Sequence, residues 1–169
     1  FELEADALPV EGLTLSAGLS FVDAYFVDFK GDRCYAGQPG CGPGSTIDSS
    51  GNRLPNAPKW TFTLSGNYKR PINEYWNGFV QAATYSRSSM NFSSNGNPNT
   101  VHDGYTLLDA SAGLSSANDV WKVSLFCRNC FDKRFVTFIN ASSQTRTDYY
   151  QMFGLNSFRT LGLALNWRF

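Results

Sequence analysis

The four cysteines and the single histidine are the residues of this 169-residue chain with the clearest capacity for chemistry. Cys34 and Cys41 flank the sequence YAGQPG, inside a segment rich in Gly, Pro, Asp and Ser. Closely spaced cysteines in the loops of exported proteins commonly form disulfides. We therefore expect a Cys34–Cys41 disulfide, with two free thiols as the alternative.

Cys127 and Cys130 form a CxxC, a spacing that redox enzymes and zinc sites also use. No second CxxC completes a zinc site, and His102 lies in the distant stretch NPNTVHDG, without a Ser or Cys nucleophile motif around it. We expect no metal site, no cofactor and no enzymatic activity. The sequence leaves the pairing of Cys127 and Cys130 open.

The composition narrows the choice of partners. Acidic and basic residues balance at 14 each, which argues against a nucleic-acid partner. Aromatic residues are abundant at 15%, whereas charged residues make up only 17%. Many aromatic and few charged residues indicate that part of the protein surface contacts something other than water.

The elements that carry these residues are predicted to be strands. No apolar run reaches the roughly 18 residues of a transmembrane helix, but alternation of apolar and polar residues recurs along the chain, as in LGLALNWRF at residues 161–169. The strands of a transmembrane β-barrel alternate in this way. The pattern predicts seven strands, at residues 1–8, 13–28, 58–70, 76–90, 104–115, 120–139 and 157–169.

The connections between these strands alternate between short and long. The short ones are 9–12, 71–75 and 115–119, and the long ones, rich in Gly, Asn and Ser, are about 28–58, 91–103 and 140–156. Transmembrane barrels have this arrangement, with short periplasmic turns and long outer loops. The alternative is a soluble β-sandwich, which would have turns of mixed length at both ends.

The distribution of side chains fits a membrane wall. Four aromatic residues close to the short turns are predicted to form an interfacial girdle: Tyr68, Trp76, Trp121 and Trp167. Five polar residues on the opposite faces of the strands are predicted to meet water or a plug: Lys69, Lys122, Arg128, Asn166 and Arg168. The charges of residues 23–33 precede the cysteine loop, and ligand capture and simple hydration are equally consistent with them.

An odd number of strands predicts a piece of a larger barrel, because bacterial single-chain barrels have an even number. The chain also begins without Met or a signal sequence, so we expect a processed or cut product. A turn at residues 128–132 would instead split 120–139 and give a complete eight-stranded barrel, with an adhesin or structural role. We favour a bulge at Asn129, which would not reverse the chain.

Several stretches resemble the C-terminal part of TonB-dependent outer-membrane receptors. The run RNCFDKRF resembles their Asn-Leu-Phe-Asp-Lys-x-Tyr signature through Asn129, Phe131, Asp132 and Lys133, with Cys130 in place of Leu and Phe135 in place of Tyr. Three other stretches resemble further parts of these barrels, in the order of the family: PVEGLTLSAGLSFVDAYF, GNRLPNAPKW and FGLNSFRTLGLALNWRF.

The resemblance implies that residues 1–169 form about the last third of a 22-stranded barrel, without the plug domain and the N-terminal strands. It implies an outer-membrane location in a Gram-negative bacterium and TonB-driven uptake of a siderophore, cobalamin, carbohydrate or similar ligand. The implied partners are lipid, the rest of the receptor, TonB through the absent N-terminal part, the barrel assembly machinery and an unidentified small molecule.

Two sets of residues have expected roles. The alternating apolar residues of the last strand resemble the signal that the assembly machinery reads: Leu161, Leu163, Leu165, Trp167 and Phe169. A charged residue in place of Phe169 is expected to impair assembly more than ligand binding, as measured by barrel yield. From their residue types, Asn129 and Asp132 are expected to stabilise a bulge by bonding nearby backbone amides, with ligand contact as the alternative.

Overall fold

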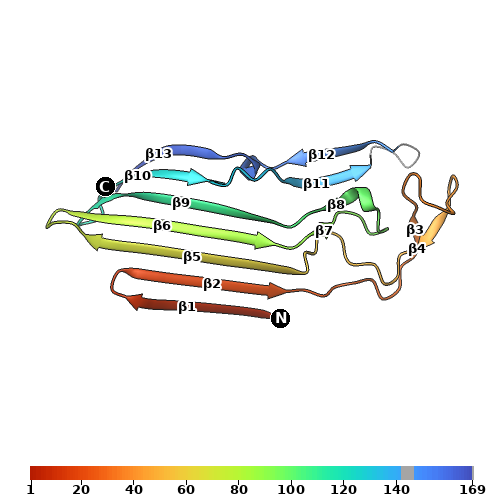
Figure 1. Ribbon diagram of the computed structural model, residues 1–169, viewed down its shortest axis with the longest axis horizontal. Helices are drawn as coiled ribbons and strands as arrows, with labels where there is room; N and C mark the ends of the chain where they lie inside the picture. The colour runs from red at the N-terminus through yellow and green to blue at the C-terminus, as the bar shows by residue number, and fades with distance from the viewer. Residues whose placement is uncertain (142–146, 169) are drawn as a thin grey trace.

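The computed structural model describes residues 1–141 and 147–168, and its main feature is one antiparallel sheet of seven strands (Figure 1). The expected seven strands are therefore confirmed. In spatial order they are β1 (Glu2–Val10), β2 (Leu13–Phe21), β5 (Trp60–Pro71), β6 (Trp76–Arg87), β9 (Tyr105–Ser116), β10 (Trp121–Arg128) and β13 (Thr160–Trp167).

Short turns lie at one end of this sheet and long connections at the other (Figure 1). Three small two-stranded sheets form within the long connections: β3 (Lys30–Arg33) with β4 (Thr46–Asp48), β7 (Met90–Asn91) with β8 (Val101–His102), and β11 (Val136–Ala141) with β12 (Tyr149–Phe153). Two 3₁₀ turns, Pro98–Thr100 and Leu155–Ser157, complete the secondary structure of the described residues. We call the long-connection end the outer end.

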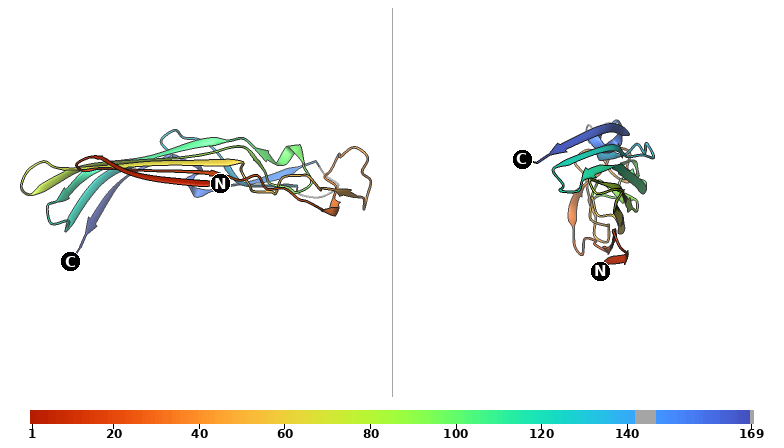
Figure 2. Two further views of the ribbon diagram at one scale, coloured as in Figure 1. Left: turned by 90° about the horizontal axis from the view of Figure 1, so that it is seen from below. Right: turned by 90° about the vertical axis from the view of Figure 1, so that its left-hand side faces the viewer.

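The main sheet is a single curved layer (Figure 2). Its outermost strands in the pairing order are β1 and β13, and within the described residues these two strands do not pair with each other. The sheet is therefore an open barrel wall, and the sandwich alternative is wrong. No helix among the described residues is long and apolar enough to cross a membrane.

The segment expected as one strand at 120–139 is interrupted. β10 ends at Arg128, and β11 begins at Val136 and continues in the same direction (Figure 1). Since the chain does not reverse at residues 128–132, the eight-stranded alternative is wrong. The interruption is longer than the expected bulge, because residues 129–135 form an irregular turn with its own hydrogen bonds.

Cross-strand pairing gives the sheet two chemically different faces. Leu125 pairs with Leu163 and Trp121 with Trp167, so their side chains project from the same face. We call this the apolar face. Leu125 and Leu163 are 69% and 68% exposed, and the described chain buries few large apolar side chains. Such a continuous exposed apolar surface indicates contact with lipid or with another apolar surface.

The tight turn between β1 and β2 depends on a glycine. Gly12 has a φ of +83°, and a Cβ atom there would collide with the backbone carbonyl oxygen of Lys69. The Lys69 amide donates a hydrogen bond to the Gly12 carbonyl at 2.8 Å. Only glycine combines this backbone conformation with this approach to β5.

Candidate functional surface: the polar face and the outer-end loops

The second face of the sheet, the polar face, consists mainly of small and hydrogen-bonding side chains. Gln81 donates to the Asn67 side chain at 3.0 Å and accepts from the Ser111 hydroxyl at 3.3 Å, so a polar ladder crosses β5, β6 and β9. Shallow hollows on this face are lined by Asp6, Ser16, Ser65, Asp109 and Arg128, among others. A face of this composition is suited to water or a polar partner.

The expected polar-face residues lie on one side of the sheet. Lys122 pairs with Ser115 and Asn166, and Arg128 pairs with Thr160. The Lys122 ammonium lies 4.2 Å from the centre of the Phe79 ring, a cation–π contact that covers one of the buried apolar residues.

A second polar group joins the three long connections at the outer end. Asn97 is buried, and its side-chain amide donates to the Tyr149 hydroxyl at 2.9 Å. Asn95 donates to the Arg33 carbonyl at 2.8 Å. These bonds bring the described parts of the three long connections together around a concave site, with β11 and β12 supplying the third side.

The lining of this outer-end site is amide-rich. It includes Arg33, Tyr35, Ser93, Asn95, Thr100 and Asn140. These side chains and the exposed backbone offer donors and acceptors for a polar ligand. Sequence reasoning singled out Arg33 but missed Asn95, Asn97 and Tyr149; the Asn-rich run NFSSNGNPNT was the available signal.

The charged residues that precede the cysteine loop do not gather into one site. Lys30 lies 3.5 Å from Asp28, and both side chains are strongly exposed. Arg53 bonds Asp23 at 3.0 Å, whereas Asp32 accepts from the Ser49 hydroxyl at 2.7 Å. These contacts fold the loop on itself.

His102 lies where the polar face meets the outer end. Its Nε2 accepts a hydrogen bond from the Val136 amide at 3.1 Å, so Nδ1 carries the proton and donates to the Asp103 carbonyl at 2.6 Å. The Arg87 guanidinium stacks on the Tyr105 ring at 4.5 Å, and Tyr105 stacks on Phe135 at 4.6 Å. The histidine therefore ties the start of β11 to β8.

The signature residues Asn129 and Asp132 bond backbone groups. The buried Asn129 side chain donates to the carbonyls of Lys133 and Asn156, at 3.0 and 3.1 Å, and accepts from the Lys133 amide at 2.9 Å. Asp132 accepts from the Arg159 amide at 3.2 Å, which lowers the pKa of its carboxyl. The pair therefore connects the end of β10 to the start of β13. Phe131 is exposed.

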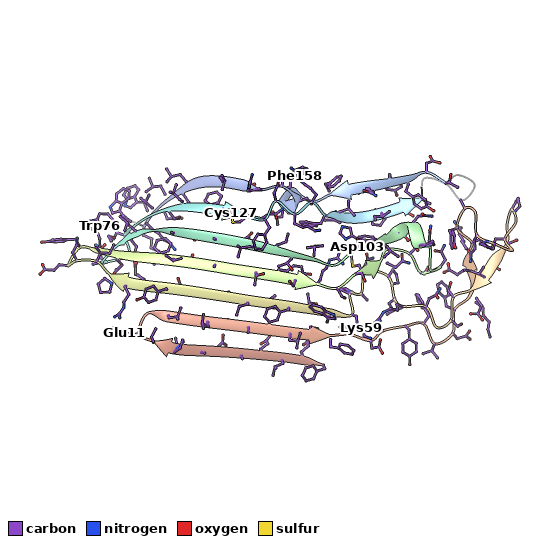
Figure 3. The ribbon with its side chains drawn as sticks, viewed as in Figure 1. Glu11, Lys59, Trp76, Asp103, Cys127 and Phe158 are labelled. Carbon is purple, nitrogen blue, oxygen red and sulfur yellow. A yellow bond between two sulfur atoms is a disulfide. The ribbon has the colours of Figure 1, made fainter. Side chains whose placement is uncertain are left out.

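Both cysteine pairs are disulfides. Cys34 and Cys41 are joined as predicted, with their Cα atoms 6.3 Å apart. Cys127, near the outer end of β10 (Figure 3), is joined to Cys130, which resolves the pairing that the sequence left open. The described chain holds no free cysteine, and no group of three His, Cys, Asp or Glu side chains in it is arranged to bind a metal ion.

Replacing Cys34 and Cys41 by Ser should loosen the loop without weakening the sheet. The disulfide closes a short ring between β3 and β4 within the 22–59 connection, outside the seven-stranded sheet. We expect faster tryptic cleavage at Lys30 and Arg33 and an unchanged melting temperature. The matched control is Ser at Cys127 and Cys130, which should leave cleavage at those two sites unchanged. Equal cleavage rates in wild type and the Cys34 and Cys41 variant would contradict this prediction.

The short-turn end carries the four aromatic residues of the predicted girdle. The Trp121 and Trp167 rings stack at 5.4 Å, and the Trp121 amide donates to the hydroxyl of Ser116, the residue that pairs with Trp76. Tyr68 pairs with Val80, further along β6. Phe169, the last residue of the predicted assembly signal, lies outside the described residues, whereas Leu161, Leu163, Leu165 and Trp167 share the apolar face.

An ion pair at the short-turn end is expected to make the stability of the fold depend on pH. The Lys69 ammonium bonds the Asp119 carboxylate at 2.8 Å, and this hydrogen bond lowers the pKa of Asp119 from its ordinary value of 3.8. The pair therefore stabilises the fold above that value, and the contribution is lost as the pH falls through the lowered pKa.

The Lys69→Gln variant should therefore melt slightly below wild type at pH 7, because the pair is exposed, and the difference should shrink as the pH falls through the lowered pKa of Asp119. Thermal melts of both proteins over a series from neutral to acid pH measure this. A difference that persists unchanged in acid would show that Lys69 acts through packing and not through Asp119.

The fold and its two faces define a class: this is a section of the wall of an antiparallel β-barrel. A sequence model of the family described as TonB dependent receptor-like, beta-barrel matches residues 1–130. The chain belongs to this family. Most of the RNCFDKRF signature follows the matched residues.

Two solved receptor structures are similar to this chain. The ferric yersiniabactin uptake receptor FyuA from Yersinia pestis is 17% identical, with a TM-score of 0.72 over 97% of this chain and 22% of the receptor chain. The siderophore receptor PiuA from Acinetobacter baumannii is 24% identical, with a TM-score of 0.69 over 98% of this chain and 21% of the receptor chain. The chain thus spans about a fifth of the length of these two receptors.

Proposed function

We propose that this chain is the C-terminal section of the barrel of a TonB-dependent receptor in the outer membrane of a Gram-negative bacterium. In the complete receptor, the remaining strands would close the barrel, and a plug domain would fill it. TonB would act through the N-terminal part of the receptor, which precedes this section of the barrel. The observation that carries the proposal is the family match over residues 1–130.

The geometry of the sheet supports this role. The apolar face would meet lipid, and the polar face would meet the plug and water. The short turns would lie in the periplasm and the long connections outside the cell. The girdle residues would then lie at the periplasmic interface, where aromatic rings are favoured.

The outer-end site is the part of this chain that we assign to ligand contact. It is lined by side chains from all three long connections, and loops supply much of the ligand selection in proteins of this architecture. The candidate ligands are a ferric siderophore, cobalamin, a carbohydrate or a similar molecule. One of the two similar structures is a siderophore receptor and the other a ferric yersiniabactin uptake receptor, so ferric siderophores are the first ligands to test.

The test is uptake by cells that carry the complete receptor. A strain that lacks the gene should be compared with a complemented strain for uptake of labelled ferric siderophores, cobalamin and oligosaccharides. We expect complementation to restore the uptake of one ligand class, and deletion of TonB to abolish it. Uptake that persists without TonB would contradict the proposal, as would no restored uptake of any tested class by a receptor that is present in the outer membrane.

The Asn97→Ala variant tests the assignment of the outer-end site. Loss of the buried Asn97 amide removes its bond to Tyr149 and weakens the link between the 88–104 connection and β12, which keeps the bond from Asn99 to the Tyr149 hydroxyl. We expect receptor affinity for its ligand to fall about tenfold, the equivalent of one to two hydrogen bonds. Asn118→Ala in a short turn is the control and should bind normally. Equal ligand affinity in the two variants would rule out this site.

A further inference from the structure

One charged residue stands out on the apolar face. In the seven strands as the structure describes them, Arg70 is the single charged side chain in the register rows of this face: it pairs with Gly78, which pairs with Leu114. Arg70 is the residue before the last of β5, at the short-turn end, and it lies near Glu11 in the β1–β2 turn. Figure 3 shows Glu11 at this end of the sheet. A charge on a lipid-facing surface is tolerated best at the interface, where it can meet a headgroup.

The Arg70 guanidinium is held by contacts with Tyr68 and Glu11. Its Nε donates to the Tyr68 hydroxyl at 3.0 Å, and its Nη1 lies 3.5 Å from a carboxylate oxygen of Glu11. The Arg70 side chain is 50% exposed and that of Glu11 is 89% exposed. A fixed cation and an exposed anion therefore lie side by side at the edge of the apolar face.

An apolar hollow lies directly beside this charge pair. It is lined by Tyr68, Arg70, Ile72, Gly78, Val80 and Leu114, among others. The Ile72 side chain packs closely over Gly78, where a Cβ atom would come within 3.0 Å of it. The apolar lining of the hollow suits a hydrocarbon chain, and the two charges lie at its edge.

We propose that this hollow binds one phosphatidylethanolamine molecule. The phosphate would accept hydrogen bonds from the Arg70 guanidinium, the ammonium group would donate to Glu11, and one acyl chain would lie along Val80 and Leu114. A zwitterionic headgroup matches the adjacent cation and anion, whereas a purely anionic headgroup would place its charge against Glu11. The inference rests on the proposed function, which places the short turns at the phospholipid leaflet of the outer membrane.

The experiment uses the complete receptor, purified in detergent and titrated with phosphatidylethanolamine, phosphatidylglycerol and phosphatidylcholine that carry identical acyl chains. Native mass spectrometry counts the bound lipids. We expect tightest binding of phosphatidylethanolamine, and a loss of about tenfold in Arg70→Gln, as for one charge-assisted hydrogen bond. Glu11→Gln should remove the preference for phosphatidylethanolamine over phosphatidylglycerol. Lys69→Gln, on the same strand but the opposite face, is the control and should bind lipids as wild type does.

Equal binding of phosphatidylethanolamine and phosphatidylcholine by the wild type would overturn the proposal, as would unchanged binding by Arg70→Gln. If Arg70→Gln does not fold, Glu11→Gln in the exposed turn decides the matter by its headgroup preference. Heat-modifiable migration of the receptor from outer membranes reports barrel formation separately. A folded outer-membrane barrel without headgroup preference would therefore overturn the lipid site and leave the proposed function intact.

Discussion

Asn129→Ala is expected to destabilise the barrel by about 3–5 kcal/mol, because several terms add at this one position. The buried amide donates to Lys133 and Asn156 and accepts from Lys133, and Ala would leave these buried backbone groups without their partner. The residue also has a φ of 47°, a conformation that Asn tolerates better than Ala does. The measurement is the urea midpoint for unfolding of the complete receptor in lipid.

Asn56→Ala is the matched control for the cost of placing Ala at a positive φ. Asn56 has a φ of 60°, is exposed and lies in a loop. It should therefore lose only the conformational preference, about 1 kcal/mol. If both variants lost the same stability, the hydrogen bonds of Asn129 would contribute nothing, and its role as a clamp between β10 and β13 would be wrong.

Leu163→Arg is expected to prevent insertion of most of the protein into the outer membrane. Leu163 is 68% exposed on the apolar face, in the middle of β13 and opposite Leu125. An arginine near the centre of a lipid-facing surface costs about 2–4 kcal/mol in transmembrane barrels. The fraction of heat-modifiable receptor in outer membranes measures this effect.

Asn166→Arg provides the comparison on the same strand. Asn166 pairs with Lys122 on the polar face, where a further cation meets water. This variant should insert normally. Normal insertion of Leu163→Arg would mean that the apolar face does not contact lipid, and the proposed membrane orientation would fail with it.

The main sheet was predictable because its signals are local and repeated. Alternation in LGLALNWRF and in the strands before it gave both the number of strands and the face of each side chain, since neighbouring residues of a strand point to opposite faces. Turn-forming residues marked the short reversals, with Pro and Gly at 9–12, Pro and Asn at 71–75, and Ser, Asn and Asp at 115–119. The Cys34–Cys41 disulfide was predictable for the same reason, because both partners lie in one short loop.

The outer end was less predictable because its contacts join segments that are distant in the sequence. The expected strand 13–28 stops at Phe21, and the chain beyond it pairs instead within the loop, where Tyr25 forms a bridge with Arg53. The bond from Asn97 to Tyr149 likewise connects two separate loops. No periodicity marks such contacts, and the amide-rich composition alone does not identify the partners.

The clamp at Asn129 also bears on how quickly the sheet can assemble. Two pairings of the sheet close the longest connections: β2 pairs with β5 across residues 22–59, and β10 pairs with β13 across residues 129–159. The entropy cost of closing a loop grows with its length. When the β11–β12 hairpin forms first and Asn129 bonds Asn156, the two strand ends are already adjacent. The pairing of β10 with β13 then closes only a short loop, as in a local hairpin. We therefore expect Asn129→Ala to slow folding as well as to speed unfolding.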